Sequence, residues 1–301
     1  FGPYQDAMSK GSSSLFHTRI SALLNIHRLL PAEITDDVLK MDLPLPSKEG
    51  FVRQVLGWRE FVHHVHLATD GFRTMPTGTP PVAKRPGDGG YSRWAGKSWP
   101  DKWSREDPDG GAKPSFLGGN NPLPQAYWGE ESGLNCLDEV VSQVWREGYG
   151  HHITRLMVLS NLATLLEISP RELTDWFWVA YGDAYDWVVE PNVLGMGTYA
   201  VGDLMTTKPY TSGAAYINKM GDFCQSCLFD PKKNCPITNL YWSFLDRHQE
   251  SLKNNPRLRM IMATLRKRNK SLRQYDQKVF QRLSKTLKDG AEITPENLPK
   301  K

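Results

Sequence analysis

The hydrophobic positions along this chain are spaced mainly as they are in helices. Between residues 17 and 30 apolar side chains recur on one face, and Pro31 blocks continuation of the helix that this pattern predicts. A second helix is expected over residues 51–65, where the apolar stripe consists of Phe51, Val55, Trp58, Val62 and Val65. No segment shows a convincing two-residue alternation, so the sequence predicts an all-α fold in a single domain over residues 1–301.

The middle of the chain predicts three further helices. The first carries the apolar positions Leu137, Val140, Val141 and Val144 and ends at Gly148. The second, over residues 151–168, is apolar on nearly every side, which is typical of a central buried helix. The third begins at a capping box, Ser169 to Glu172, that has proline at its first helical position.

Two stretches, residues 70–133 and 182–213, are expected to be irregular. A loop as long as the first is uncommon unless it is functional or disordered. It also contains tryptophans, which argue against full disorder because each needs a surface to bury against: Trp94, Trp99, Trp103 and Trp128. After them, helices are expected over residues 238–252 and, as the last helix, from Pro256 onward.

Composition adds limits but no activity. With 301 residues and a hydrophobic content of 39%, the chain can form a sizeable core. There is no apolar run of about 18 residues and no secretory leader, so we expect a soluble, cytoplasmic protein without a membrane partner. The net charge of +4 permits an anionic partner, although the basic run over residues 257–278 is more typical of a solvated helix face. The start at Phe1 suggests a piece of a longer protein.

The cysteines form the clearest chemical pattern. Cys224 and Cys227 have C-x2-C spacing, Cys235 follows after a short loop, and the fourth cysteine, Cys136, lies far upstream. Such a set can hold a structural zinc ion or an iron–sulfur cluster, or it can consist of free thiols. A fourth ligand from a distant helix favours an iron–sulfur cluster clamped between two parts of the fold.

Other candidate chemistry is less specific. His151 and His152 open the most buried helix, where a satisfied core histidine is the commoner outcome, and adjacent residues cannot both face one site. Buried ion pairs are expected between Arg155 and the acidic residues Asp183, Asp186 and Glu190. The sequence has no dinucleotide-binding glycine motif, phosphate-binding loop or nucleophile elbow. These residues alone support a helical metal-cluster protein with a functional loop region.

Several segments, taken together, resemble the cryptochrome/photolyase family. The motif R-Q-x-x-G-W-R-E-F at residues 53–61 is similar to its flavin-domain signature. Residues 18–24 resemble its phosphate-binding segment, and residues 150–157 resemble its central FAD helix. The four cysteines and the segment KPYTSGAAYI at 208–217 resemble one branch, the iron–sulfur bacterial cryptochromes and prokaryotic (6-4) photolyases.

The resemblance implies a helical domain that holds a U-shaped FAD. The implied cofactor-binding residues are Thr18, Arg19, Ser21, Gln54, Trp58, Arg59, Arg155, Asp186, Glu190 and Asn192. In this set Arg155 and Asp186 would be paired beside the flavin ring, and either Glu190 or Asn192 would face flavin N5. A 4Fe–4S cluster is implied on Cys136, Cys224, Cys227 and Cys235, most simply as a structural element. Members normally also carry an N-terminal α/β antenna domain, here absent, for which this branch implies a lumazine-type chromophore.

The implied activity is light-driven repair of (6-4) photoproducts in UV-damaged DNA by a monomer, with electrons from reduced FAD. His152 would donate the proton, with His151 as the alternative, and Tyr210 would line the lesion pocket. Trp128 and Trp176 resemble an electron path, whereas Met196 replaces a tryptophan of common photolyases. In the long loop, the basic residues that could contact phosphate are Lys84, Arg85, Arg93 and Lys97.

Two other functions remain open from the sequence. The first is a blue-light receptor that uses photoreduction of the same FAD to signal. The second is a zinc-stapled helical DNA-binding protein without flavin, which would require the match at residues 53–61 to be fortuitous.

Overall fold

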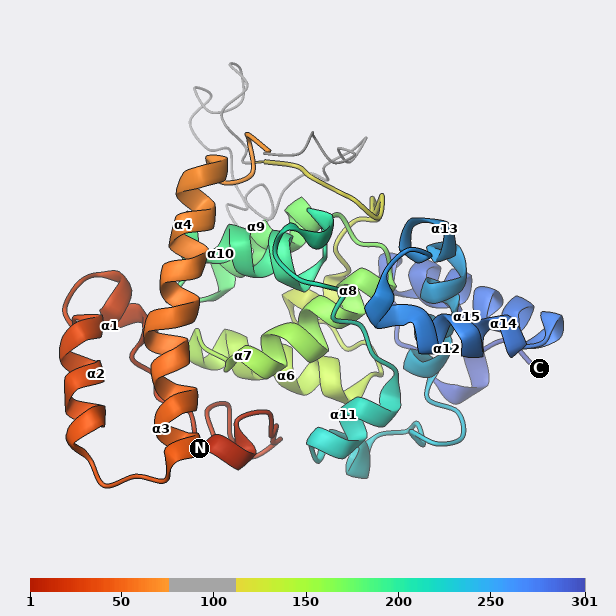
Figure 1. Cartoon of the computed structure of the whole chain (residues 1–301). Coiled ribbons are helices and arrows are strands. Elements are labelled where there is room, and N and C mark those ends of the chain that lie inside the picture. Colours follow the sequence, from red (N-terminus) through yellow and green to blue (C-terminus); the bar gives the residue numbers. More distant parts are fainter. Residues whose placement is uncertain (76–111, 301) are drawn as a thin grey trace, which may run out of the picture.

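The all-α prediction is confirmed by a computed structural model that describes residues 1–75 and 112–300 (Figure 1). Within these residues, extended pairing is limited to the isolated bridges Ser9–Ser12 and Asn121–Ile168. None of the helices in this part of the chain has the length and apolar character needed to cross a membrane. The predictions for the loop residues between 76 and 111, including Trp94, Trp99, Trp103 and the basic side chains, lie outside the described residues.

The N-terminal region differs from the prediction. The helix expected over residues 17–30 is only the short α1 (Ser21–Asn25), and Pro31 begins a second helix, α2 (Pro31–Lys40). Proline is well suited to a first helical position, since the amide hydrogen it lacks would have no partner inside the helix. The sequence analysis predicts only that Pro31 ends the preceding helix, and it does not predict that Pro31 begins α2.

The predicted second helix is longer than its apolar stripe. It runs without a break through α3 (Leu45–Val52), a π-helical turn (Arg53–Trp58) and α4 (Arg59–Thr69), along one side of the molecule in Figure 1. Asp70 ends it in the left-handed conformation, with a φ of 47°. The flavin-signature motif therefore lies on a wide helical turn rather than on a regular helix.

The central helices are built as the sequence predicts. α6 (Asn135–Glu147) ends at Gly148, which has a φ of 59°. The next helix joins α7 (His152–Thr154), a π-helical turn (Arg155–Ser160) and α8 (Asn161–Leu165), and it is buried along most of its length. The side chain of Ser169 caps α9 (Pro170–Ala180) by accepting a hydrogen bond from the backbone N–H of Glu172.

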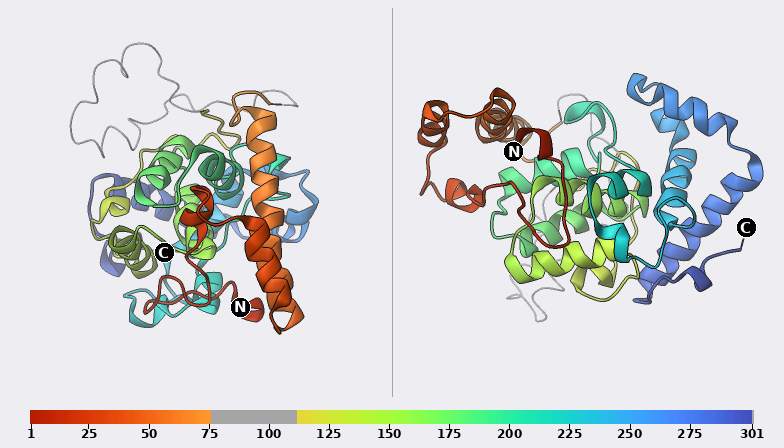
Figure 2. Two further views of the ribbon diagram at one scale, coloured as in Figure 1. Left: turned by 90° about the vertical axis from the view of Figure 1, so that its left-hand side faces the viewer. Right: turned by 90° about the horizontal axis from the view of Figure 1, so that it is seen from below.

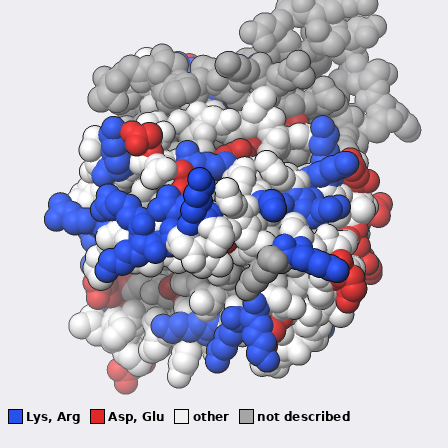
Figure 3. Space-filling model, turned by 90° about the vertical axis from the view of Figure 1, so that its right-hand side faces the viewer, with Lys and Arg blue, Asp and Glu red and all other residues white. Residues whose placement is uncertain are grey.

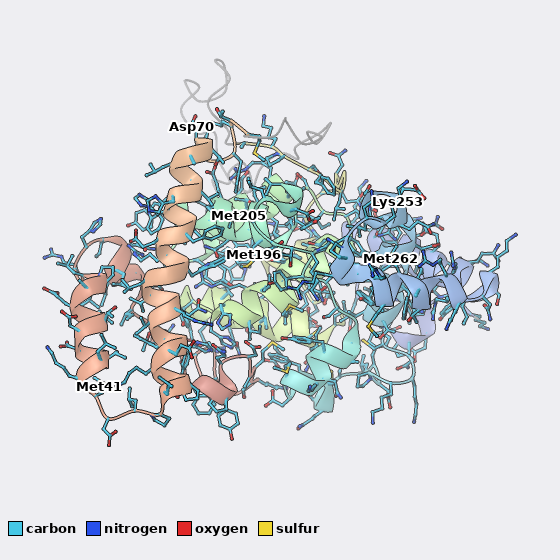
Figure 4. All side chains as sticks on the ribbon, viewed as in Figure 1. Met41, Asp70, Met196, Met205, Lys253 and Met262 are labelled. Carbon is cyan, nitrogen blue, oxygen red and sulfur yellow. The ribbon has the colours of Figure 1, made fainter. Side chains whose placement is uncertain are left out.

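The sequence pattern predicts that residues 182–213 are irregular, but part of this segment is helical. They contain α10 (Asp186–Val189) followed by a π-helical turn (Glu190–Gly197). Pro191 and the glycines of this segment suggested loop structure, yet a π-helical turn accommodates such residues and is common at functional sites. The helix carries Asn192 and Met196, and Figure 4 labels Met196 near the centre of the molecule.

The C-terminal part forms a layer on the opposite side of the central helices from α2 (Figure 2). It consists of α12 (Pro236–Arg247), α13 (Gln249–Leu252), α14 (Arg259–Lys267) and α15 (Lys270–Lys288). The shorter α11 (Ala214–Met220) lies below α6 in Figure 1. The single last helix expected from Pro256 is therefore two helices. Asn269 separates them and caps α15 by accepting a hydrogen bond from the backbone N–H of Leu272 at 2.8 Å.

Candidate functional site

A cavity of about 590 Å³ lies between α1, the helix that contains α3 and α4, the start of the central helix and the segments after α9. Its walls bring together most of the residues that the sequence singled out for cofactor and substrate. These are Thr18, Ser21, Gln54, Trp58, Arg59, His151, His152, Arg155, Asn192 and Tyr210. Met196 also lines the cavity. Residues separated by almost 200 positions in the sequence therefore share one pocket.

An ion pair between Arg155 and Asp183 holds the cavity wall together. Two guanidinium nitrogens of Arg155 donate to the two carboxylate oxygens of Asp183 at 3.0 and 2.9 Å. Burial acts to raise the pKa of Asp183, but the positive charge of Arg155 and the hydrogen bonds from Arg155 and Ser21 together outweigh it and hold the pKa below its ordinary value. The guanidinium also lies 4.1 Å from the centre of the Tyr181 ring.

The same carboxylate connects this pair to α1. Ser21 Oγ donates to Asp183 Oδ2 at 2.6 Å, and Asn25 Nδ2 donates to the backbone oxygen of Asp183 at 2.8 Å. Arg59 then donates to Asn25 Oδ1 at 2.7 Å, which joins α4 to the network. The predicted pairing of Arg155 with Asp186 is wrong.

Three predicted residues lie outside the cavity wall. Asp186 is exposed and accepts a hydrogen bond from Trp178 Nε1 at 2.7 Å, because it points outward at the start of α10. Arg19 lies 3.0 Å from Glu147 and 4.6 Å from the centre of the Tyr149 ring. Glu190 is buried on the other side of its helical turn.

The side chains of Glu190 and Asn192 point in different directions. Trp58 Nε1 donates to Asn192 Oδ1 at 2.7 Å, and this holds Asn192 in the cavity wall. Glu190 instead lies 3.5 Å from both Arg171 and His66. Burial raises the pKa of Glu190 to about 7, against the opposing effect of the Arg171 charge. The group that faces the cavity is therefore an amide, which hydrogen-bonds but is not an acid.

The two adjacent histidines have different environments. His151 is 2% exposed, and neither ring nitrogen has a hydrogen-bond partner among the described residues. Burial, together with the neighbouring imidazoles, lowers the pKa of His151 to about 3, so this ring is neutral at ordinary pH. The His152 side chain is 41% exposed, with Nε2 3.5 Å from Asp6 Oδ1. The hydrogen bond from His152 lowers the pKa of Asp6.

His17 was not predicted as a site residue, but it joins these two histidines. Its ring centre lies 4.6 Å from that of His151 and 5.0 Å from that of His152. The hydrogen bond between His17 Nε2 and the backbone oxygen of Gln5 measures 2.9 Å. No local motif connects residue 17 with residues 151 and 152, so only the tertiary fold reveals this cluster.

A series of aromatic rings leads from the cavity to the surface. Phe177 and Tyr181 line the cavity, and their ring centres lie 5.2 and 6.1 Å from that of the fully buried Trp176. Trp145 lies 6.3 Å from Trp176 and 5.8 Å from Trp128, also measured between ring centres. The indole N–H groups of Trp145 and Trp176 donate to the same backbone oxygen, that of Tyr127, at 2.9 and 2.8 Å. Trp145, absent from the predicted path, bridges its two predicted members.

The four cysteines line a second, small pocket with apolar walls. Cys136 at the start of α6 meets Cys224, Cys227 and Cys235 there, and all four are free thiols. Burial raises the pKa of Cys235 to about 12, so a thiolate at this position needs a compensating cation. The backbone N–H of Phe229 donates to Cys227 Sγ at 3.5 Å. The donor set is therefore chemically suited to a thiolate-bound metal centre.

The sulfur atoms are too widely spaced for a preformed zinc site. Among the described residues, no three of these sulfur atoms lie within 4.8 Å of one another. A tetrahedral zinc ion with four thiolates would hold its sulfur atoms about 3.8 Å apart.

The sequence was compared with protein families and with known proteins. No family model matches the chain. A (6-4) photolyase of Agrobacterium fabrum (strain C58 / ATCC 33970) is 32% identical over 282 residues, which cover 91% of this chain and 48% of that protein. The chain belongs to the cryptochrome/photolyase family. An uncharacterized protein of Acanthamoeba polyphaga mimivirus is 28% identical over 127 residues, which cover 42% of this chain and all of that protein.

The chain spans about half the length of the photolyase that it matches. Membership of the cryptochrome/photolyase family implies FAD binding, and the cavity is suited to such a ligand. It is large, its walls are mainly aromatic and apolar, and its polar groups converge from several helices. Among the residues that the structure describes, the buried ring nitrogens of His151 and the buried Tyr181 hydroxyl have no hydrogen-bond partner, and a bound polar group could satisfy them.

The Arg155–Asp183 pair can be tested with two matched substitutions. We expect Asp183→Asn to lower the free energy of unfolding by about 3 kcal/mol, because it leaves a largely buried guanidinium without its carboxylate. Asp186→Asn, the control, should change it by less than about 0.5 kcal/mol. Urea unfolding of both variants measures the difference, and equal effects would contradict the assignment.

The same experiment has a pH dependence. Because the pKa of Asp183 in the folded protein is below the ordinary value of 3.8, its stabilising contribution is present at neutral pH and is lost as the pH falls through the folded-state pKa. The difference in stability between the wild type and Asp183→Asn should therefore shrink in acid.

Proposed function

We propose that this chain is the flavin-binding, catalytic half of a light-driven enzyme that repairs (6-4) photoproducts in DNA. The observation that carries the proposal is the single cavity in which the predicted cofactor residues meet His152 and Tyr210. Both of these side chains are partly exposed, at 41% and 37%, so a ligand that enters from solvent can reach them. The similarity to a (6-4) photolyase over most of the chain supports this choice of lesion.

The residues that would hold FAD fall into two groups. Thr18 and Ser21 offer hydroxyl groups near the start of α1, suited to the pyrophosphate, and Gln54 and Arg59 line the same side of the cavity. Arg155 and Asn192 also line the cavity, where they would orient the ring system. Bound FAD in its reduced form supplies the light-driven electron that repair requires. Asn192 supports the ring by hydrogen bonding only.

The environments of the histidines favour His152 over His151 as the proton donor. His151 is buried and neutral, whereas His152 is accessible and has the carboxylate of Asp6 within 3.5 Å. The Asp6 carboxylate holds the His152 imidazole in one orientation. His152 would therefore donate a proton to a lesion that has been flipped out of the duplex, and Tyr210 would contact that lesion at the rim.

A basic face provides a surface for the DNA backbone. Figure 3 shows a band of basic side chains over the C-terminal helices. The exposed ones are Lys253, Arg257, Arg259, Arg266, Lys267, Lys270, Lys278, Arg282, Lys285 and Lys288. The one acidic residue between positions 253 and 288, Asp276, is buried and bonded to Arg268. A surface of one sign attracts phosphate.

The basic face is joined to the rim of the cavity. Lys253, Arg259 and Arg266 line a groove of about 450 Å³, together with Asn255 and with Glu250, which pairs with Lys253. Asn255 Nδ2 donates to the backbone oxygen of Thr207 at 2.8 Å, three residues before Tyr210. This connection favours phosphate contact over the solvated helix face that composition alone suggested.

For the cysteine pocket we propose a 4Fe–4S cluster with a structural role. The four thiols in one pocket, the fourth ligand from a distant helix and the N–H donor to Cys227 support iron–sulfur ligation over a single zinc ion. The cluster would fasten the start of α6 to the segment between α11 and α12.

Repair of defined lesions tests the proposed activity. Illuminated protein should restore oligonucleotides that contain a (6-4) photoproduct and leave cyclobutane dimers unrepaired. His152→Asn should reduce the rate by about 10²–10⁴-fold, because the proton donor is lost. His64→Asn, which alters an exposed histidine on α4, is the control. Repair of neither lesion, alongside normal flavin photoreduction, would support a blue-light receptor instead.

Metal analysis tests the proposed cluster. Anaerobically purified protein should contain about four iron atoms per chain and no stoichiometric zinc. Cys224→Ser should lose most of the iron, whereas Gln225→Ala, an exposed neighbour, should retain it. One zinc ion per chain in place of iron would contradict the proposal.

The aromatic series predicts which residues supply electrons when the flavin is photoreduced. Trp145→Phe should slow photoreduction of the bound flavin by a thiol reductant, because it interrupts the contact between Trp128 and Trp176. Trp242→Phe, on α12, serves as the control. Transient absorption measures both rates. Equal rates in the two variants would remove Trp145 from the path.

A further inference from the structure

We propose that His17, His151 and His152 form a binding site for one divalent zinc ion at the rim of the cavity, and that zinc bound there inhibits the protein. Each histidine offers one ring nitrogen, and the three nitrogens lie within 4.8 Å of one another. Among the described residues, this is the one group of histidine, cysteine and acidic side chains with such proximity. The site is distinct from the cysteine pocket, which has its own four ligands.

Binding the ion requires a ring to rotate, because the planes of His17 and His151 are stacked 8° apart and the lone pairs in parallel planes do not converge on one ion. Zinc binds imidazole nitrogen at 2.0–2.1 Å, so two nitrogens in a tetrahedral site are about 3.4 Å apart. The three ring centres are separated by 4.6, 5.0 and 6.2 Å. His152 is partly exposed and can rotate, whereas His151 is held in the core. An open coordination position toward the cavity would remain for water.

The hydrogen bonds of the rings leave nitrogen lone pairs available. His17 Nε2 lies 2.9 Å from the backbone oxygen of Gln5, a bond in which this nitrogen must be the donor. His17 Nδ1 therefore carries the lone pair. His152 Nε2 faces the Asp6 carboxylate at 3.5 Å, which likewise directs Nδ1 away from the carboxylate. Carbonyl and carboxylate acceptors on the opposite nitrogen are the usual supports of zinc-bound histidine.

The third ring, that of His151, is the one whose nitrogens lack hydrogen-bond partners among the described residues. His151 is 2% exposed. Buried polar atoms are rarely left unsatisfied. A flavin or a lesion in the cavity could satisfy His151, but it would leave unexplained why His17 converges on the same point from a distant segment. A metal ion accounts for all three rings together.

Zinc at this site would have a direct consequence for repair, and this consequence rests on the function proposed above. A zinc-bound imidazole has no lone pair or labile proton at the coordinated nitrogen, and the ion would repel protonation of the other rings. His152 would then be unable to donate a proton to the lesion. The ion would also occupy the rim between His152 and the cavity.

Direct metal binding tests the site. The flavin- and cluster-loaded protein is titrated with Zn²⁺ in a calorimeter, and total iron and zinc are measured before and after. We expect one added zinc per chain with no loss of iron. His17→Asn should weaken binding by at least about tenfold, and Asp6→Asn by about tenfold through loss of the supporting carboxylate. His64→Asn, which alters an exposed histidine elsewhere, should bind zinc as the wild type does.

The inhibition is measured separately as the ratio of repair rates with and without Zn²⁺. This ratio should fall in the wild type and in His64→Asn but stay near one in His17→Asn. Equal zinc affinity in His17→Asn and His64→Asn would overturn the site, whatever the repair assay shows. If zinc binds as expected but the wild-type repair ratio stays near one, the inhibitory role is overturned. Absence of any repair, with zinc binding intact, would instead refute the proposed enzyme and leave the metal site standing.

Discussion

The cavity depends on one buried interaction, the bidentate ion pair between Arg155 and Asp183. Arg155 belongs to the central helix, and Asp183 lies in the turn between α9 and α10. Ser21 and Asn25 bind the same acidic residue, so α1 is positioned by it as well. Removing charges from water is costly, and such a pair is favourable only when its remaining hydrogen bonds are also made. The completeness of this network explains why three separate segments can surround a cavity without collapsing into it.

The fold also gives neighbouring residues opposite environments. His151 is the cap residue before α7 and His152 is its first residue, so one side chain enters the core while the other reaches the rim. Glu190 and Asn192 are separated in the same way by the π-helical turn, one toward Arg171 and the other toward Trp58. In both pairs the ionisable group with the strongly shifted pKa is the buried one. A search for shifted pKa values alone would therefore have selected His151 and Glu190. The residues at the open side of the cavity are instead His152 and Asn192.

Local signals in the sequence predicted the central helices well. Gly148 ends α6, and Ser169 with Pro170 begins α9, because caps depend on a few adjacent residues. The predictions at two prolines are wrong. Pro31 begins a helix, and Pro191 lies within a π-helical turn, because the effect of a proline depends on the conformation of the neighbouring backbone. Family resemblance predicted most of the cavity residues but chose Asp186 over Asp183. Three positions separate these acids, but Asp183 lies in the turn before α10 and pairs with Arg155, whereas Asp186 begins α10 and accepts a hydrogen bond from Trp178. His17 and Trp145 have no local signal, since their partners come from distant segments.

A single helix, α6, connects the chemistry at the two sites. Cys136 lies at its start, in the cysteine pocket, and Trp145 lies near its end, in the aromatic series. Glu147 follows, accepting a hydrogen bond from Ser13 at 2.6 Å and pairing with Arg19 just before α1. A metal centre that fixes the start of α6 would therefore restrain the indole of Trp145 and the entry to the cavity without exchanging electrons with either. Such a role requires only that the helix behave as a rigid body, which its buried apolar face supports.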